Sequence, residues 1–188
     1  RVLALAHSTL PLKDGKVQRV PKLVALILIE DQIRKEAYDT IKFFRDNNVQ
    51  VKVISGDNPV TVSEVARRVG IENAEDYISL EGLTDEEVAQ VANTYTVFGR
   101  VKPNQKKIIV QSLKAHKHTV AMTGDGVNDI LALKEADCSI AMASGCDAVR
   151  NVAQVVLLDS NFASMPKVVA EGRRVINNIQ QTACLFLV

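Results

Sequence analysis

The segment AMTGDGVND at residues 121–129 runs directly into ILALKEADCSIAM at residues 130–142. It places Asp125 and Asp129, together with two glycines and an asparagine, between an apolar stretch that reads as a strand and a helical pattern. Gly126 allows a bound group to approach the backbone closely, and the helix start behind it offers free N–H groups to an anion. The segment therefore predicts a strand–loop–helix unit that holds a phosphate group beside a metal ion.

The rest of the chain alternates short apolar runs, typical of strands, with amphipathic segments, typical of helices. This alternation predicts an α/β fold in which helices cover both faces of a parallel sheet. The run LVALILI at residues 23–29 indicates a strand that is covered on both faces. We expect the other strands at residues 1–6, 49–55, 96–100, 118–124, 136–142 and 153–159, and a last helix from about residue 164 to the end.

Two helix starts carry clear local signals. Asn58 and Pro59 supply an N-cap and a first helical residue. Thr84 and Glu87 have the spacing of a capping box, in which each side chain bonds the other residue's backbone N–H. These signals predict helices that begin just after residues 58 and 84.

The composition argues against several classes of protein. A net charge of +1 argues against a broad basic surface for nucleic acid, so we expect no nucleic-acid partner. The three cysteines have no metal-ligand spacing, and an odd number without a disulfide framework indicates a reducing, cytosolic compartment. No apolar run reaches the roughly 18 residues of a membrane-spanning helix. The tail TACLFLV at residues 182–188 reads as the beginning of a longer apolar segment.

Acidic residues follow the predicted strands. Asp31, Asp57, Asp125 and Asp159 each come at or just after the end of an apolar run. In an open α/β sheet, ligands bind beyond the carboxyl ends of the strands, so these acids are expected at one edge. Carboxylates that lie so close together stay ionised only beside a cation. Oxygen ligands supplemented by water favour Mg²⁺.

A hydroxyl and a lysine complete a set suited to a phosphoryl group. Ser55 supplies the hydroxyl and Lys106 the positive charge, while Asp125 is the expected metal ligand and Asp129 orients its surroundings. The sequence argues against a dinucleotide-binding loop, which would need glycine at position 129, because a carboxylate there would repel a pyrophosphate. Taken singly, Asp129 also fits an ordinary first-turn helix acid, and Lys106 fits a solvated helix face. No nucleophile is evident. Asp31 ends an apolar run, but position 33 lacks the second acid that a phosphatase with an aspartate nucleophile would use.

At this point the chain closely resembles the haloacid-dehalogenase (HAD) superfamily, and within it the P-type ATPases, which are cation pumps that form an aspartyl-phosphate. The hinge motif of that family matches MTGDGVND, and its TGD motif matches SGDN with serine for threonine. The DPPR-type motif is only partly matched, because DQIR keeps Asp31 and Arg34 but lacks both prolines. The matching segments, which include the stretch ending in the phosphate-binding lysine and the stalk helix, are residues 31–34, 55–58, 99–106, 122–129 and 171–181.

The resemblance implies a role for each matching residue. Asp125 would coordinate Mg²⁺ with support from Asp129. Lys106 and Ser55 would hold the transferred phosphoryl group, with the Gly56 N–H as a further donor. The remaining matches belong to the nucleotide region: Asp57 orients nucleotide and phosphate, Asn128 contacts phosphate or metal, Arg100 and Asp31 lie near the ribose, Arg34 supports the hinge between domains or pairs structurally with Asp57, and Arg1 reaches the ATP phosphates.

One departure from the family is large, because its DKTGT segment, whose aspartate is phosphorylated, does not occur in this sequence. The expected fold is therefore a HAD-like Rossmannoid parallel sheet that lacks the strand carrying that aspartate. We expect three parts: residues 1–20 as the final strand and hairpin of the nucleotide-binding domain plus hinge, 21–170 as the C-terminal part of the phosphorylation domain, and 171–188 as a stalk helix leading into a membrane helix.

The resemblance implies part of an ATP-driven pump. Its cofactors would be ATP and Mg²⁺, and its partners the other domains of the same pump and a cation bound in the membrane domain, with calcium suggested by the branch it most resembles. The domain would face the cytosol at a bacterial plasma membrane and would be inactive on its own. Two alternatives stay open: a soluble HAD-type phosphatase with Asp31 as nucleophile, and a non-catalytic module that binds Mg²⁺ or nucleotide.

Overall fold

The protein divides into two units, residues 1–34 and 35–188. The computed structural model describes residues 2–11, 13–29 and 32–187. Arg1 and Asp31, both expected near the nucleotide, lie outside the described residues.

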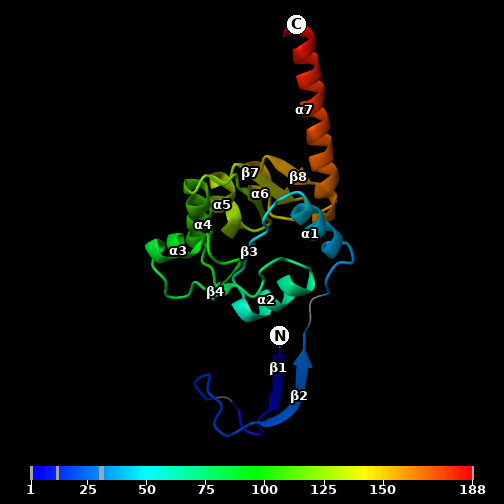
Figure 1. The fold of residues 1–188 in the computed structure, drawn as a ribbon. Helices are drawn as coiled ribbons and strands as arrows, with labels where there is room; N and C mark the ends of the chain where they lie inside the picture. The colour runs from blue at the N-terminus through cyan, green and yellow to red at the C-terminus, as the bar shows by residue number, and fades with distance from the viewer. Residues whose placement is uncertain (1, 12, 30–31, 188) are drawn as a thin grey trace. The chain divides into compact units, whose positions relative to one another are not determined.

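The first unit is a two-stranded antiparallel hairpin (Figure 1). It pairs β1 (Val2–His7) with β2 (Lys22–Leu28), with Val2 opposite Leu28. The expectation that both faces of the apolar run at 23–29 are covered is wrong for the described residues, since Val24 is 60% and Leu28 is 78% exposed. The run is apolar enough for a strand covered on both faces, but its sequence does not say which segments cover it.

The first sheet of the second unit has three parallel strands in the order β3-β5-β4. These are β3 (Val53–Ile54), β5 (Val97–Gly99) and β4 (Tyr77–Ser79). The helices between them are α2 (Pro59–Arg68) and α3 (Asp85–Val91), which begin as expected. Asn58 caps α2 through its side chain, and Thr84 and Glu87 form the complete capping box of α3. Strand β4 was not expected, and β3 is much shorter than the predicted 49–55.

The second sheet is also parallel, in the order β6-β7-β8. Its strands are β6 (Ala121–Gly124), β7 (Cys138–Met142) and β8 (Val155–Leu157). The flanking elements are α1 (Ala37–Asp46), α4 (Pro103–Ala115), the 3-10 turn η1 (Val127–Asp129), α5 (Ile130–Glu135), α6 (Asp147–Val152), the 3-10 turn η2 (Phe162–Ser164) and α7 (Met165–Leu187). Parallel sheets flanked by helices confirm the predicted α/β class.

The strands fall into two sheets, although one sheet was expected. Among the described residues β3 pairs only with β5, and β6 pairs only with β7. The two sheets nevertheless share a core, because Ile54 of β3 packs both against the cluster around Phe98 and Ile109 and against the cluster around Val110 and Met122. The carboxyl ends of β3 and β6 carry the two polar segments, SGD and GDGVND.

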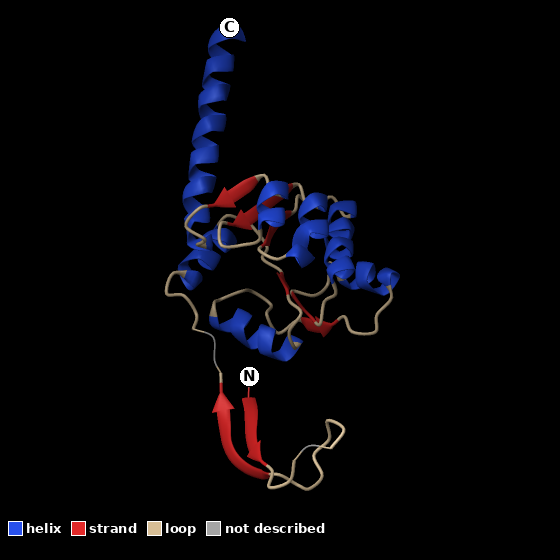
Figure 2. Ribbon diagram, turned by 180° about the vertical axis from the view of Figure 1, so that it is seen from behind, coloured by secondary structure: helices blue, strands red, loops and turns tan. Residues whose placement is uncertain are grey.

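Within the described residues, the contacts that anchor helix α7 to its unit lie near its beginning. Arg173 Nη2 donates to Asn47 Oδ1 at 2.9 Å, and the ring of Phe162 in η2 lies 5.5 Å from that of Phe44 in α1. Every side chain from Glu171 to Phe186 is exposed, and Figures 1 and 2 show the helix extending beyond the rest of its unit. Over the part of the chain that the structure describes, no helix combines the length and hydropathy needed to cross a membrane.

The close approach of β5 to α2 gives a first prediction. A Cβ at Gly99 would lie 2.5 Å from the backbone N and the ring Cδ of the buried Pro59. We expect Gly99→Ala to lower the free energy of unfolding by about 1–3 kcal/mol or more, because backbone atoms must shift to admit the methyl group. Urea denaturation of the chain measures this.

Gly172 provides the matched control. A Cβ at Gly172 meets nothing within 4 Å, and the residue lies inside α7. Gly172→Ala should raise stability by up to about 1 kcal/mol through helix propensity. Equal effects of the two substitutions would contradict the packing seen at Gly99.

Candidate functional site

The loop after β6 is folded around the side chain of Asp129. The Oδ2 atom of Asp129 accepts hydrogen bonds from the backbone N–H of Asp125 at 3.3 Å and of Gly126 at 3.2 Å. Gly124 makes room for this carboxylate, because a Cβ there would lie 2.5 Å from Asp129 Cβ. The acid at position 129 therefore shapes the loop, a role beyond that of an ordinary first-turn helix acid.

The second carboxylate oxygen of Asp129 binds Lys106. Lys106 Nζ lies 2.6 Å from Asp129 Oδ1, and the two side chains are only 15% and 10% exposed. The pair joins α4 to η1, and Figure 1 shows α4 beside α5, the helix that follows η1. Gln105 fixes the first turn of α4 by accepting from Lys102 N and donating to Leu80 O. Lys106 is therefore a partly buried, paired cation rather than a solvated surface lysine.

Asp125 differs from Asp129 because its side chain faces solvent. Its residue is exposed, and its carboxylate makes no hydrogen bond or ion pair with the residues that the structure describes. Its backbone is held on both sides, by Asp129 Oδ2 and by Cys146 N, which donates to Asp125 O at 3.0 Å. Asn128 is also exposed on this loop. A fixed backbone thus presents an available carboxylate.

The residues present fit a magnesium ion better than a closed metal cage. Within the described ranges there is no group of three or more His, Cys, Asp or Glu arranged to hold a metal. Mg²⁺ commonly takes one or two carboxylates and completes its coordination with water and phosphate oxygens. The exposed carboxylate of Asp125 satisfies that requirement.

The loop after β3 forms a second polar group. Asp57 N donates to Ser55 Oγ at 3.1 Å, which turns the backbone at Gly56. The end of β5 holds this loop, because Arg100 N donates to Asp57 O at 2.9 Å and Val101 N to Ser55 O at 3.1 Å. The structure therefore joins Ser55, Gly56, Asp57 and Arg100 in one arrangement.

Comparison with known proteins identifies the family that uses these segments. A model described as hydrolase, haloacid dehalogenase-like hydrolase, matches residues 3–137. The chain belongs to the haloacid dehalogenase-like hydrolase family. This family membership confirms the resemblance drawn from MTGDGVND and SGDN.

Relatives of this HAD-like chain are long transport proteins. It is 50% identical over 190 residues to a probable cation-transporting ATPase, exp7, of Streptococcus pneumoniae, and 49% identical over 187 residues to the calcium-transporting ATPase CtpE of Mycobacterium tuberculosis. Both comparisons cover 100% of this chain but only 24% of the relative, so the chain spans about a quarter of their length.

A solved structure of an ATPase domain has a similar fold. The catalytic domain of the CPx-ATPase CopB-B, studied for its conformational changes upon nucleotide binding, matches with a TM-score of 0.59 and 25% sequence identity. The match covers 79% of this chain and 50% of that one.

Two predicted residues of the HAD-like chain stand apart from this description. Arg34 lies in the unit of residues 1–34, and its role at the hinge stays a prediction. Asp159 is used locally: it accepts from the Ser164 hydroxyl and from Asn161 N, and these two bonds hold the pKa of its carboxyl below the usual value. Asp159 therefore bonds both ends of the η2 turn, whose N-cap is Asn161. Among the predicted residues, Lys106, Asp129 and the backbone of Asp125 are in direct contact at the GDGVND loop. Ser55, Asp57 and the backbone of Arg100 are in direct contact at the SGD loop.

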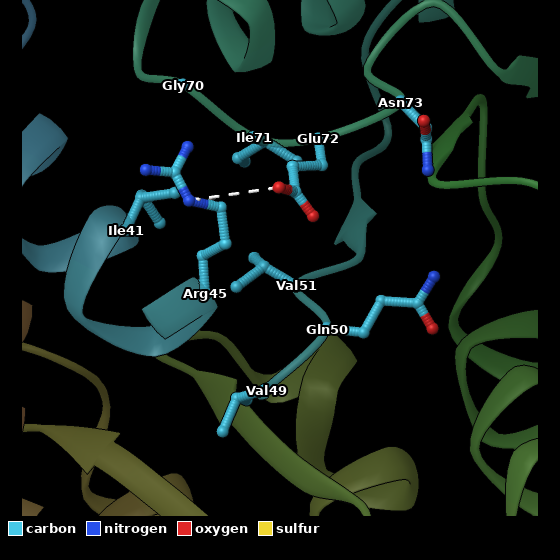
Figure 3. Close-up of a pocket in the computed structure, with 9 residues that line it drawn as sticks. All are labelled: Ile41, Arg45, Val49, Gln50, Val51, Gly70, Ile71, Glu72 and Asn73. Atoms are coloured by element: carbon cyan, nitrogen blue, oxygen red, sulfur yellow. Dashed lines mark ion pairs between the residues drawn. The ribbon is translucent and has the colours of Figure 1, made fainter. Parts of the chain in front are cut away.

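The HAD-like unit also has a small pocket that lies away from these residues. It is formed by Val49–Val51 before β3, by Gly70–Asn73 between α2 and β4, and by α1, where Arg45 Nε lies 3.8 Å from Glu72 Oε1 (Figure 3). These segments precede their strands, whereas the polar loops follow β3 and β6. Its volume of about 40 Å³ and its internally paired charges give it no part in the phosphate site.

Sequence reasoning missed one contributor to the site. The loop at residues 143–146 packs on Asp125, through Cys146 N and through Gly145, where a Cβ would lie 2.8 Å from Asp125 O. This loop makes its contacts through backbone atoms, so no side-chain motif in the sequence predicts them. Of these contacts, the close approach at Gly145 is the one that depends on residue type, because it leaves no room for a Cβ.

Proposed function

We propose that this chain is the C-terminal part of the phosphorylation domain of a P-type ATPase, which couples hydrolysis of Mg-ATP to cation transport through an aspartyl-phosphate. The observation that carries the proposal is the buried Lys106–Asp129 pair beside the exposed carboxylate of Asp125. The expected metal ligand lies on the GDGVND loop, and the cation lies on α4 and is bonded to Asp129 of that loop. Two relatives named as ATPases, alike over the whole chain, support it.

Each residue then has a defined task. Bound Mg²⁺ would supply positive charge to the transferring phosphoryl oxygens. Asp125 would hold the ion, and Asp129 would keep the loop and Lys106 oriented. Lys106 Nζ would turn from Asp129 toward the phosphoryl group, where a positive charge stabilises the developing negative charge. Ser55 Oγ and the Gly56 N–H would donate hydrogen bonds to the same group.

The open sheet edges support a missing nucleophile strand. Within the described ranges, β3 and β6 each pair on one side only, and their carboxyl ends carry the two polar loops. Unpaired edges favour the addition of another strand. A strand between β3 and β6 would join the two sheets into the single sheet expected from the sequence. It would also end between Ser55 and Asp125, where an attacking aspartate is needed.

The nucleotide would occupy the β3 side of the site. Asp57 and Arg100 are exposed on that side, and Asn128 is exposed on the GDGVND loop. Arg1 would reach the ATP phosphates from the nucleotide-binding domain, Asp31 would lie near the ribose, and Arg34 would support the hinge between domains. Residues 1–20 would then be the last part of the nucleotide-binding domain, 21–170 the phosphorylation domain, and 171–188 the stalk toward the membrane. This arrangement would place the site on the cytosolic face of a bacterial plasma membrane. Calcium is the cation we propose, because CtpE is named as a calcium transporter.

Arg100 gives a prediction that separates nucleotide binding from stability. Its φ of 54° lies in the left-handed region, which costs a non-glycine residue about 1–2 kcal/mol. Arg100→Gly should therefore leave the free energy of unfolding within about 1 kcal/mol of the original, since relief of strain offsets the greater freedom of the unfolded chain. We expect ATP affinity in the full-length protein to fall about tenfold with the loss of a charged hydrogen-bond donor.

Lys117→Gly is the matched control for that experiment. Lys117 is exposed and has a φ of 65°, but it lies before β6, at the other end of the strand from the site. Its replacement should have the same small effect on stability and none on nucleotide affinity. Displacement of a fluorescent ATP analogue measures the affinity, and an unchanged value for Arg100→Gly would exclude Arg100 from the nucleotide site.

Labelling with radioactive ATP tests the proposed function. The full-length protein should form an acid-stable, hydroxylamine-sensitive phosphoenzyme that requires Mg²⁺, while the 188-residue chain alone should form none. Stable labelling of the isolated chain would overturn the proposal. Phosphatase turnover by the isolated chain that disappears in Asp31→Asn would instead support a soluble HAD-type phosphatase.

A further inference from the structure

Arg150 of α6 is bonded to the backbone of the loop that precedes its helix. Its Nη1 donates to Ala143 O at 2.6 Å and to Gly145 O at 2.8 Å. Its Nη2 pairs with the Asp147 carboxylate in the first turn of the same helix. The guanidinium therefore ties together the start of α6 and both ends of residues 143–145.

The same loop touches the backbone of Asp125. Cys146 N donates to Asp125 O at 3.0 Å, and Gly145 N donates to Met142 O at 2.9 Å. The chains approach so closely that a Cβ at Gly145 would lie 2.8 Å from Asp125 O and 3.1 Å from Asp125 Cα. A displacement of this loop therefore displaces the backbone that carries the exposed carboxylate.

The two supports of Asp125 come from different parts of the chain. Asp129 holds its N–H from within the GDGVND loop, and the 143–146 loop holds its C=O. The second support depends on Arg150, since charged donors make the stronger hydrogen bonds and a planar guanidinium can bond two carbonyls in fixed directions. Arg150 is itself partly shielded, with 36% of its side chain exposed.

We propose that Arg150 is a positioning residue for the magnesium site, acting through the 143–146 loop on the backbone of Asp125. This inference rests on the proposed function for the identity of the ion. The contacts themselves do not depend on it. Groups that orient metal ligands commonly change metal affinity about 10–100-fold when they are removed.

Two variants of the full-length protein test the role of Arg150 by changing different contacts of the 143–146 loop. Arg150→Met removes the donors to the loop, and Gly145→Ala forces the loop away from Asp125. Arg150→Lys should restore part of the effect, because an ammonium group can still donate to one carbonyl. Arg67→Met is the control, since Arg67 also pairs with an acid three residues earlier on a helix, Glu64, and its side chain donates to no loop among the described residues.

The first readout is independent of activity. Hydrogen–deuterium exchange of the peptide covering residues 121–129, measured without Mg²⁺, should become at least about threefold faster in Arg150→Met and Gly145→Ala. Exchange in α2 and α3 should be unchanged. The second readout is the Mg²⁺ concentration that gives half-maximal phosphoenzyme, which should rise about tenfold in both variants and about threefold in Arg150→Lys. Arg67→Met should match the original protein in both.

The outcomes separate the two proposals. Unchanged exchange and an unchanged Mg²⁺ requirement in Arg150→Met would overturn the role of Arg150. If Arg150→Met does not fold, Gly145→Ala and Arg150→Lys decide by the same criteria. If the original protein forms no phosphoenzyme that depends on Mg²⁺, the proposed function fails, and the exchange rates alone decide whether Arg150 holds the backbone of Asp125.

Discussion

Replacing Asp125 with asparagine in the full-length protein is expected to lower phosphoenzyme formation by at least about 100-fold. The substitution removes the negative charge of the exposed carboxylate that would hold the metal ion. It should leave the free energy of unfolding within about 0.5 kcal/mol of the original, because the side chain makes no bond among the described residues. Labelling with radioactive ATP over a range of Mg²⁺ concentrations measures the effect.

Asp39→Asn is the matched control. Asp39 is another exposed carboxylate, in the first turn of α1, and it takes no part in either polar loop. Labelling of Asp39→Asn should equal that of the original protein. A loss of less than about tenfold in Asp125→Asn would show that another group holds the ion.

The largest loss of stability should come from breaking the Lys106–Asp129 pair on the Asp129 side. Asp129→Ala leaves the Lys106 ammonium shielded without its counterion and leaves the Asp125 and Gly126 amides without their acceptor. Removing one partner of a buried ion pair costs about 3–5 kcal/mol. Phosphoenzyme formation should be lost as well, because the loop that carries Asp125 loses its shape.

A double-mutant cycle separates this pair from its surroundings. Lys106→Met alone should cost less, since the Asp129 carboxylate keeps its two backbone donors. The double variant should be more stable than Asp129→Ala alone, because no unpaired ammonium is left. Urea denaturation of the original chain, the two single variants and the double variant gives the coupling energy, and strictly additive effects would contradict the direct pairing.

Much of the fold could be predicted because its signals are local. The N-cap at Asn58, the capping box of Thr84 and Glu87, and the alternation of apolar runs with helical patterns are written in neighbouring residues, and the structure contains them all. Strand β4 was missed since three residues, Tyr77–Ser79, carry too little periodicity. The prediction that both faces of β2 are covered was wrong, because the segments that cover a strand can lie far from it in the sequence.

For the candidate site, the sequence suggested which residues take part but not which contacts they make. Lys106 and Asp129 were both assigned to the phosphate site from motifs, but their ion pair joins residues 23 positions apart and depends on how α4 packs beside α5. Asp159 had the position of a site residue, yet its carboxylate accepts hydrogen bonds from the nearby Ser164 hydroxyl and Asn161 N. The contacts of Arg150 were not predicted, because it binds backbone carbonyls, which every residue type has.

The central claim is that the SGD loop after β3 and the GDGVND loop after β6 surround one phosphoryl group. A structure of the full-length protein with Mg²⁺ and beryllium fluoride, which mimics a phosphoryl group on an aspartate, tests it most directly. We expect Asp125 to ligate the ion, with Lys106 Nζ and Ser55 Oγ both within hydrogen-bond distance of the fluorides. A bound fluoride contacted by neither Lys106 nor Ser55, or an ion held without Asp125, would contradict the account.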